Sequence, residues 1–226
     1  MLYILDTADL DAIKHCNEFY PLDGVTTNPS IIAKEHDDFW KIVKGIREII
    51  GEDKMLHVQT TQTKAEKIVE EAKLLVNELG GNTYVKIPIS EEGLKATMML
   101  KKLNIRVTVT AIFTPAQALI SAKAGASFVA PYVNRLDNIL GDGTNVVEEI
   151  VKQFNIYKLD TKVLVASFKN AEQVHKSAAA GCHCVTINEE ILKLITHHPM
   201  TDIAIEGFEK DWARVYGDKK ILDFEV

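Results

Sequence analysis

Short apolar runs alternate with longer amphipathic segments along the whole chain. The runs are rich in β-branched and aromatic residues, and between them apolar residues recur three and four positions apart. The first pattern is typical of strands in a buried parallel sheet, and the second is typical of helices with one apolar face. The pattern predicts eight strands, each followed by a helix, at about residues 2–5, 24–27, 55–58, 83–88, 105–109, 127–130, 163–166 and 182–187.

Local signals predict where several helices begin and end. Thr114 precedes a proline and is a good N-cap, and Gly125 can close the helix that follows. Thr7 is expected to cap the first helix, and Thr63 to open a capping box. These signals fall between the predicted strands, as strand–helix alternation requires.

Composition and length support one domain. The chain has 226 residues, of which 46% are hydrophobic and 26% charged, and its net charge is −6. Eight strand–helix units without a dividing linker predict a TIM (β/α)8 barrel over residues 1–226, with 200–226 as an additional C-terminal helical extension.

The charge pattern and the apolar runs also exclude several classes of protein. No basic stripe favours nucleic-acid binding, and no apolar run approaches the ~20 residues of a membrane span. The start of the chain lacks the basic segment of a signal peptide, and its three cysteines are too few and scattered for a disulfide framework. We therefore expect a cytoplasmic protein.

Polar side chains end the predicted strands, where the active site of a TIM barrel lies. One of them is a lysine inside an apolar strand, Thr83-Tyr84-Val85-Lys86-Ile87-Pro88. A lysine in such a place either extends to solvent or is chemically used. The residues at these ends are Asp6, Asn28, Gln59, Lys86, Thr110, Tyr132, Arg135 and Ser167.

This set of side chains does not suit a metal ion. Zinc needs convergent histidine, cysteine or carboxylate ligands, and the strand ends do not supply them. Cys182, His183 and Cys184 alternate between the two faces of a strand, so they do not converge and are expected to pack. We expect neither a metal nor a cofactor.

The set does suit covalent amine catalysis. Burial lowers the pKa of a lysine, so that neutral Lys86 can attack a ketone and form an iminium. Tyr132, or a water held by Gln59, Thr110 and Tyr132, can take the proton from a substrate hydroxyl. Asp6 can bind substrate hydroxyls and orient the lysine, and two further residues offer groups suited to a phosphate, Arg135 and Ser167.

Structural roles compete with these assignments. Asn28 can form an Asx turn before a proline, and Thr110 can be a satisfied core hydroxyl. Arg135 can pair with Asp137 on the surface, and Ser167 can cap the next helix.

Five segments carry a resemblance to a known family. They are Asp6-Thr7, Gly24-Val25-Thr26-Thr27-Asn28-Pro29-Ser30, Val85-Lys86-Ile87-Pro88, Ala130-Pro131-Tyr132-Val133-Asn134-Arg135 and Ala166-Ser167-Phe168-Lys169. Together they resemble the transaldolase family, and within it the small fructose-6-phosphate aldolase subgroup, over essentially the whole chain. The resemblance implies that Lys86 forms the Schiff base. It also implies that Asp6, Gln59, Thr110 and Tyr132 surround the reacting carbons, and that Arg135 and Ser167 hold the phosphate.

The resemblance implies a class I aldolase that reversibly cleaves fructose 6-phosphate into dihydroxyacetone and glyceraldehyde 3-phosphate. A transaldolase that transfers the same three-carbon unit between sugar phosphates is the alternative. Transaldolases carry a glutamate where this chain has Gln59 and a phenylalanine where it has Tyr132, so both residues favour the aldolase. A third hypothesis is a non-catalytic barrel that binds a sugar phosphate and has no need of Lys86.

The C-terminal helix is expected to bind another subunit. It carries Ile203, Phe208, Trp212 and Tyr216, more apolar surface than a terminal helix readily exposes to water. The resemblance implies a homo-oligomer in which rings of five subunits pair as a decamer.

Overall fold

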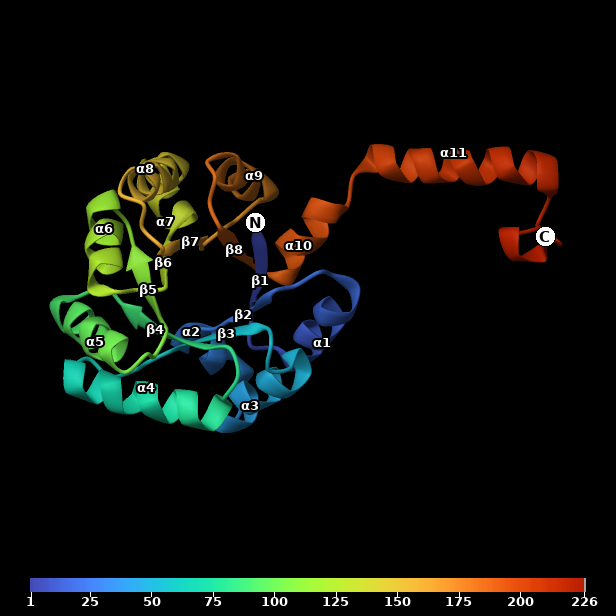
Figure 1. Cartoon of the computed structure of the whole chain (residues 1–226). Coiled ribbons are helices and arrows are strands. Elements are labelled where there is room, and N and C mark those ends of the chain that lie inside the picture. Colours follow the sequence, from blue (N-terminus) through green and yellow to red (C-terminus); the bar gives the residue numbers. More distant parts are fainter. Residues whose placement is uncertain (226) are drawn as a thin grey trace. The chain divides into compact units, whose positions relative to one another are not determined.

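Eight parallel strands close into one barrel in chain order, β1 to β8, as the alternation predicted (Figure 1). The computed structural model describes residues 1–225. Neighbouring strands along the chain pair with each other, and β8 pairs with β1 to close the barrel. The strands are β1 Leu2–Asp6, β2 Gly24–Thr26, β3 Met55–Gln59, β4 Thr83–Pro88, β5 Val107–Ile112, β6 Phe128–Pro131, β7 Lys162–Val165 and β8 Cys184–Ile187.

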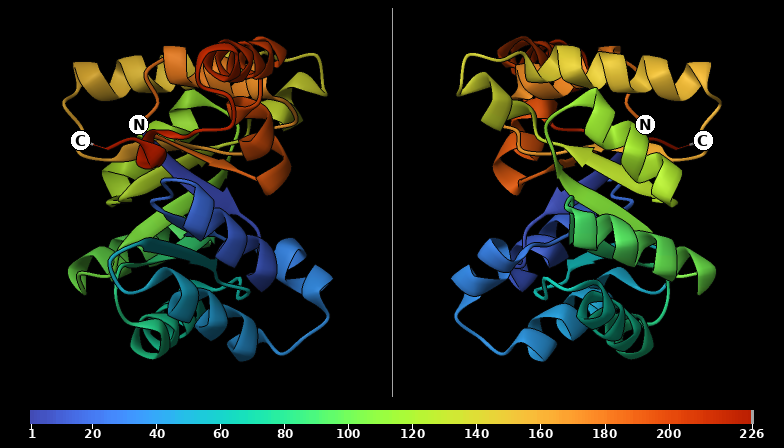
Figure 2. Two further views of the ribbon diagram at one scale, coloured as in Figure 1. Left: turned by 90° about the vertical axis from the view of Figure 1, so that its right-hand side faces the viewer. Right: turned by 90° about the vertical axis from the view of Figure 1, so that its left-hand side faces the viewer.

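The longer helices between the strands surround the barrel on its outside, as Figures 1 and 2 show. Two short ones, α2 and α7, follow β2 and β6 and were not predicted. The helices are α1 Leu10–Phe19, α2 Pro29–Ile32, α3 Phe39–Ile50, α4 Ala65–Leu79, α5 Glu91–Lys102, α6 Pro115–Ala124, α7 Val133–Asp137, α8 Gly143–Ile156, α9 Ala171–Ala179, α10 Glu189–Thr196 and α11 Pro199–Tyr216.

Two of the predicted helix starts are wrong. Asp9 rather than Thr7 caps α1, because its carboxylate accepts hydrogen bonds from two backbone N–H groups of the first turn. At α4, Thr63 forms no capping box, because the carboxylate of Glu92 accepts the N–H of Ala65 at 2.8 Å. The predicted ends of α6 are confirmed by a capping box at its start and by the left-handed backbone of the glycine that closes it.

Apolar side chains fill the end of the barrel interior where the strands begin. Inward residues of five strands form one buried cluster, which consists of Ile4, Met55, Phe128, Leu164 and Cys184. Above it, the buried ring of His57 stacks on Tyr84 at 4.7 Å between centroids, and its Nδ1 lies 2.9 Å from the hydroxyl of Thr108. Strands such as β1, β3 and β8 therefore direct apolar residues inward at their start and polar residues inward towards their end.

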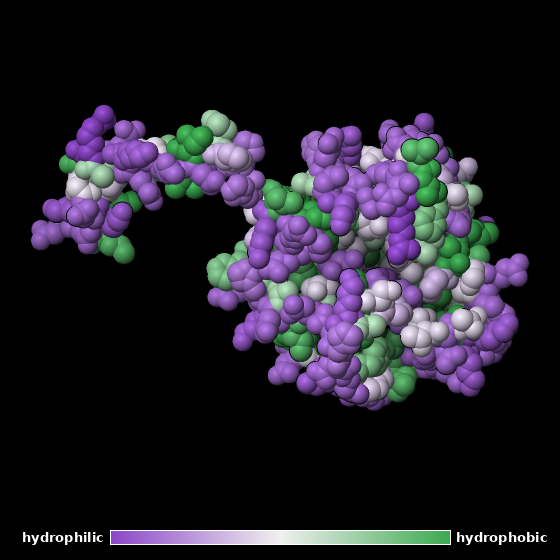
Figure 3. Space-filling view, turned by 180° about the vertical axis from the view of Figure 1, so that it is seen from behind, coloured by the Kyte–Doolittle hydropathy of each residue, from purple (hydrophilic) through white to green (hydrophobic). Residues whose placement is uncertain are grey.

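The chain forms two compact units, which are described separately. The first, Met1–Ile191, holds the barrel, and the second begins at Leu192 and holds α11. Apolar side chains are exposed on α11, as Figure 3 shows. Phe208 is 72% exposed and Ile203 60%. Among the helices of residues 1–225, none combines the length and the apolar character that crossing a membrane requires.

We expect the exposed apolar side chains of α11 to form a contact between copies of this chain. Phe208→Glu would place a charge in that contact and should reduce the molar mass in solution at micromolar concentration, and truncation after Met200 should do the same. Sedimentation velocity measures the change. Lys210→Glu, a charge change on the same helix, is the control. An unmodified chain that sediments as a monomer would contradict the prediction.

Candidate active site

All eight predicted site residues line one cavity of about 530 Å³ at the carboxyl ends of the barrel strands. They come from four strands, β1, β3, β4 and β5, and from the segments that follow β2, β6 and β7. The cavity also has lining residues that were not predicted as site residues: Pro29, Ser30, Ile31, Pro88, Ala111, Ala166 and Thr186.

Lys86 is buried at the wall of this cavity. It is 5% exposed, and its neighbours on β4, Val85 and Ile87, are fully buried. Its Nζ donates a hydrogen bond to the carbonyl oxygen of Thr27 at 2.7 Å. Burial lowers the pKa of Lys86 below its ordinary value, and the nearby Asp6 partly offsets that effect. The neutral amine of Lys86 is therefore more accessible than that of an exposed lysine.

Asp6 ends β1 and carries the opposite charge. Its Oδ1 accepts a hydrogen bond from the hydroxyl of Thr26 at 2.6 Å. Burial raises the pKa of Asp6, while the charge of Lys86 and the Thr26 hydrogen bond act against that rise. Burial therefore favours the neutral form of both Asp6 and Lys86, whereas their mutual attraction favours both charges.

The hydroxyls of Tyr132 and Thr110 lie side by side in the cavity, next to a bulge in β5. Their hydroxyl oxygens lie 3.1 Å apart. Between Thr110 and Ile112 the pairing with β6 shifts, and Ala111 has φ of +57°. The shift brings the N–H of Tyr132 to the carbonyl of Ile112 at 3.0 Å. The bulge thus fixes the two hydroxyls relative to each other.

Arg135 lies on α7 and is not paired with Asp137. Its guanidinium carbon is 5.0 Å from the ring centroid of Tyr132. Asp137 instead accepts hydrogen bonds from the N–H of Gly143 and the side chain of Gln173. The surface-pair interpretation of Arg135 is therefore wrong.

Ser167 follows β7 in the left-handed region, with φ of +62°. Its carbonyl accepts the N–H of Asn134 at 2.8 Å, which connects the ends of β6 and β7. It does not cap α9, because Asn170 does. Asn28 has a local structural role, since its side chain accepts the N–H of Ile31 at 3.0 Å as the cap of α2, and it also lines the cavity.

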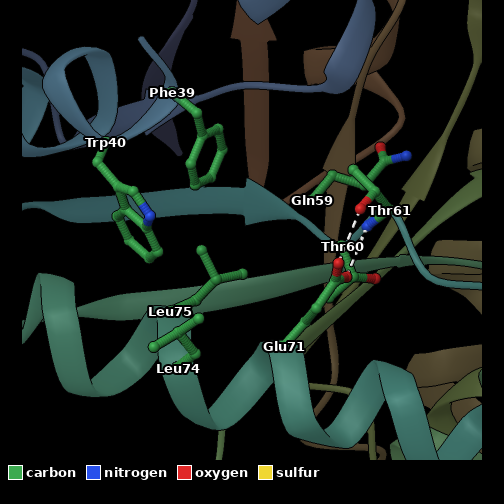
Figure 4. Close-up of a pocket in the computed structure, with 8 residues that line it drawn as sticks. All are labelled: Phe39, Trp40, Gln59, Thr60, Thr61, Glu71, Leu74 and Leu75. Carbon is green, nitrogen blue, oxygen red and sulfur yellow. Dashed lines mark hydrogen bonds between the residues drawn. The ribbon is translucent and has the colours of Figure 1, made fainter.

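A second, smaller cavity of about 200 Å³ lies behind Gln59, between β3, α3 and α4 (Figure 4). Glu71 of α4 accepts hydrogen bonds from both the N–H and the hydroxyl of Thr61, at 2.8 and 2.7 Å. It also accepts the N–H of Gln62 at 3.0 Å. The carboxylate thereby holds the loop that directly follows Gln59.

Two further residues of the site were not predicted: Thr26, although it lies in one of the five segments singled out in the sequence, and Thr186, which carried no distinct signal. Thr26 and Thr186 lie on the strands that flank β1, and their hydroxyl oxygens are 2.5 Å apart. Threonine is common in strands for reasons of shape alone, so its presence there does not predict a role in a site.

A protein-family model described as "Transaldolase/Fructose-6-phosphate aldolase" matches residues 3–220. The chain is 43% identical over 215 residues to the "Probable transaldolase" of Aquifex aeolicus (strain VF5), with 95% of this chain and 98% of that protein covered. It is 42% identical over 223 residues to the "Probable transaldolase" of Thermoplasma volcanium, with 98% and 100% covered.

Solved structures of low identity share the fold. One described as "Native KDPGal structure" is 15% identical, with a TM-score of 0.56, and the match covers 82% of this chain and 80% of that chain. A "Thiamine phosphate pyrophosphorylase from Pyrococcus furiosus" is 14% identical, with a TM-score of 0.59, and the match covers 82% and 84%. At these identities the likeness concerns the fold alone.

The left-handed backbone at Ala111 leads to a prediction about stability. A β-branched side chain is disfavoured there, so Ala111→Val should lower the free energy of unfolding by about 1–2 kcal/mol. Ala111→Gly relieves the backbone and should lower it by less. Urea unfolding of both variants measures the difference. Equal losses for valine and glycine would show that the bulge does not constrain position 111.

Proposed function

Because the chain belongs to the transaldolase/fructose-6-phosphate aldolase family, we propose that it is a Schiff-base aldolase that reversibly cleaves fructose 6-phosphate to dihydroxyacetone and glyceraldehyde 3-phosphate. The main support is the buried amine of Lys86, whose lowered pKa favours the nucleophilic form at the wall of the cavity. Asp6 and the hydroxyl pair of Thr110 and Tyr132 line the same cavity.

The proposed reaction begins with attack of the Lys86 Nζ on the C2 ketone. Loss of water gives an iminium, which accepts the electron pair released when the C3–C4 bond breaks. The proton of the C4 hydroxyl passes to a water held by Gln59, Thr110 and Tyr132, and glyceraldehyde 3-phosphate leaves. The enamine then takes a proton at C3, and hydrolysis of the imine releases dihydroxyacetone and restores the amine.

Asp6 and Arg135 have supporting roles in this proposal. The Asp6 carboxylate would accept hydrogen bonds from hydroxyls of the three-carbon unit and balance the charge of the iminium. Arg135 and Ser167 would bind the phosphate, since a guanidinium and a hydroxyl are both donors suited to its oxygens. The guanidinium of Arg135 lies beside the Tyr132 ring rather than in an ion pair with Asp137, which leaves it available to an anion.

Transaldolase activity is the second candidate, favoured by the names of the relatives from Aquifex and Thermoplasma. The two activities share every step up to the enamine. They differ in whether the enamine next takes up a proton or attacks a second aldehyde. Gln59 is neutral and can only position water, while the Tyr132 phenol can exchange protons with that water. A proton donor beside the enamine carbon favours release of dihydroxyacetone, so these two residues support the aldolase.

Tyr132→Phe should reduce release of dihydroxyacetone from fructose 6-phosphate at least tenfold, because the variant lacks the phenol that protonates the enamine. Schiff-base formation with dihydroxyacetone should fall much less. An enzymatic assay for free dihydroxyacetone measures the first. Tyr157→Phe, which removes the hydroxyl of an exposed tyrosine, is the matched control.

The opposite product pattern would favour the second candidate. If the unmodified protein forms sedoheptulose 7-phosphate from fructose 6-phosphate and erythrose 4-phosphate but releases no dihydroxyacetone, it is a transaldolase.

Arg135→Ala should raise KM for glyceraldehyde 3-phosphate in the synthetic direction while leaving KM for unphosphorylated glyceraldehyde nearly unchanged. Loss of a charge-assisted hydrogen bond corresponds to about 1.5–3 kcal/mol, or roughly 10- to 150-fold in KM. Lys169→Ala, the loss of another cation from a neighbouring segment, is the control. Similar losses for both aldehydes would mean that Arg135 is structural.

A further inference from the structure

Two buried threonines connect β8 to the Asp6 carboxylate. Asp6 pairs in register with Thr26 on one side of β1, and Thr186 lies on β8 at the other side. The Thr26 hydroxyl donates to Asp6 Oδ1 at 2.6 Å and lies 2.5 Å from the hydroxyl of Thr186. Thr26 is fully buried and Thr186 is 3% exposed, yet Thr186 lines the cavity.

The number of protons on each hydroxyl determines which group donates in the hydrogen bonds of Thr186, Thr26 and Asp6. A threonine hydroxyl has one proton to donate and two lone pairs that accept. With Asp6 ionised, Thr26 donates its proton to Asp6, and the bond between the two threonines is then donated by Thr186. The hydrogen bonds therefore run from Thr186 to Thr26 and from Thr26 to Asp6.

We propose that Thr186 is a positioning residue of the active site, which acts through Thr26 to hold Asp6 oriented and ionised beneath the substrate. The inference rests on the proposed function for its role in the reaction, but not for its effect on Asp6. A donated bond polarises the Thr26 hydroxyl and makes it a stronger donor to the carboxylate. Thr186 thereby acts on Asp6 without contacting it.

Several charged or titratable groups face the same space. Lys86 of β4 acts on Asp6 directly and favours its ionised form. Tyr132 and Arg135 line the cavity from the segment after β6. Burial raises the pKa of Asp6, and the Thr26 hydrogen bond opposes that rise. Weakening this bond should therefore raise the pKa of Asp6 further.

Thr186→Val removes the hydroxyl and keeps the shape of the side chain. The carboxylate of Asp6 should then titrate about half a pH unit higher, as measured by 13C NMR of the substrate-free protein with labelled aspartate. The acid limb of kcat for fructose 6-phosphate cleavage should move in the same direction, because a protonated Asp6 no longer balances the iminium. Thr186→Ser should keep the original titration.

Two controls separate positioning from packing. Thr108→Val removes another buried barrel hydroxyl, one that lies against His57, and should leave the titration of Asp6 unchanged. Thr26→Val should produce a larger shift than Thr186→Val. Because Thr186 acts only through Thr26, the double variant should shift no further than Thr26→Val alone.

The outcomes distinguish this inference from the proposed function. Coincident Asp6 titrations for Thr186→Val and the unmodified protein would overturn the inference, as would additive shifts in the double variant. If Thr186→Val does not fold, Thr186→Ser is compared with Thr26→Val. A serine variant in which Asp6 titrates as it does in Thr26→Val would contradict the proposed action of the Thr186 hydroxyl through Thr26. Failure of the unmodified protein to cleave fructose 6-phosphate would overturn the proposed function while leaving the NMR result valid.

Discussion

The burial of one amine, that of Lys86, is the constraint on which the rest of the site depends. A charged lysine is unfavourable inside a barrel, so the surroundings must either neutralise it or compensate its charge. The structure does both in part. Burial lowers the pKa of Lys86, while the Thr27 carbonyl and the nearby Asp6 carboxylate stabilise the ammonium form. Burial also raises the pKa of Asp6, and the charge of Lys86 opposes that rise. A change to either side chain should therefore alter the pKa of the other.

The closed barrel makes such an arrangement possible. Side chains alternate along each strand, so inward positions two residues apart differ only in height within the barrel. On β4 the ring of Tyr84 packs near the apolar cluster, and Lys86 follows one step higher at the cavity. The lower layer contributes burial and stability, whereas the upper layer contributes polar groups. The site therefore lies at one end of the barrel interior, and the other end can be filled by apolar side chains.

The fold and the site membership were predictable because they follow from residue patterns. Apolar runs predicted the strands, and the polar residues at their ends, Asp6 and Lys86 among them, meet in one cavity. Local backbone geometry was not predictable, because no glycine marks the left-handed positions Ala111 and Ser167. Capping at α4 was missed since its acceptor, Glu92, is distant in sequence. The network through Thr186 depends likewise on contacts between strands far apart in the chain.

The most direct test follows the amine itself. Sodium borohydride added with dihydroxyacetone reduces an imine to a stable adduct, which peptide mass mapping locates, and its rate of formation can be followed against pH. A buried amine of lowered pKa predicts a single adduct on Lys86 whose formation is half-maximal below pH 10.5, the ordinary pKa of a lysine. An adduct on another lysine, or cleavage of fructose 6-phosphate by Lys86→Ala, would contradict the central role of Lys86.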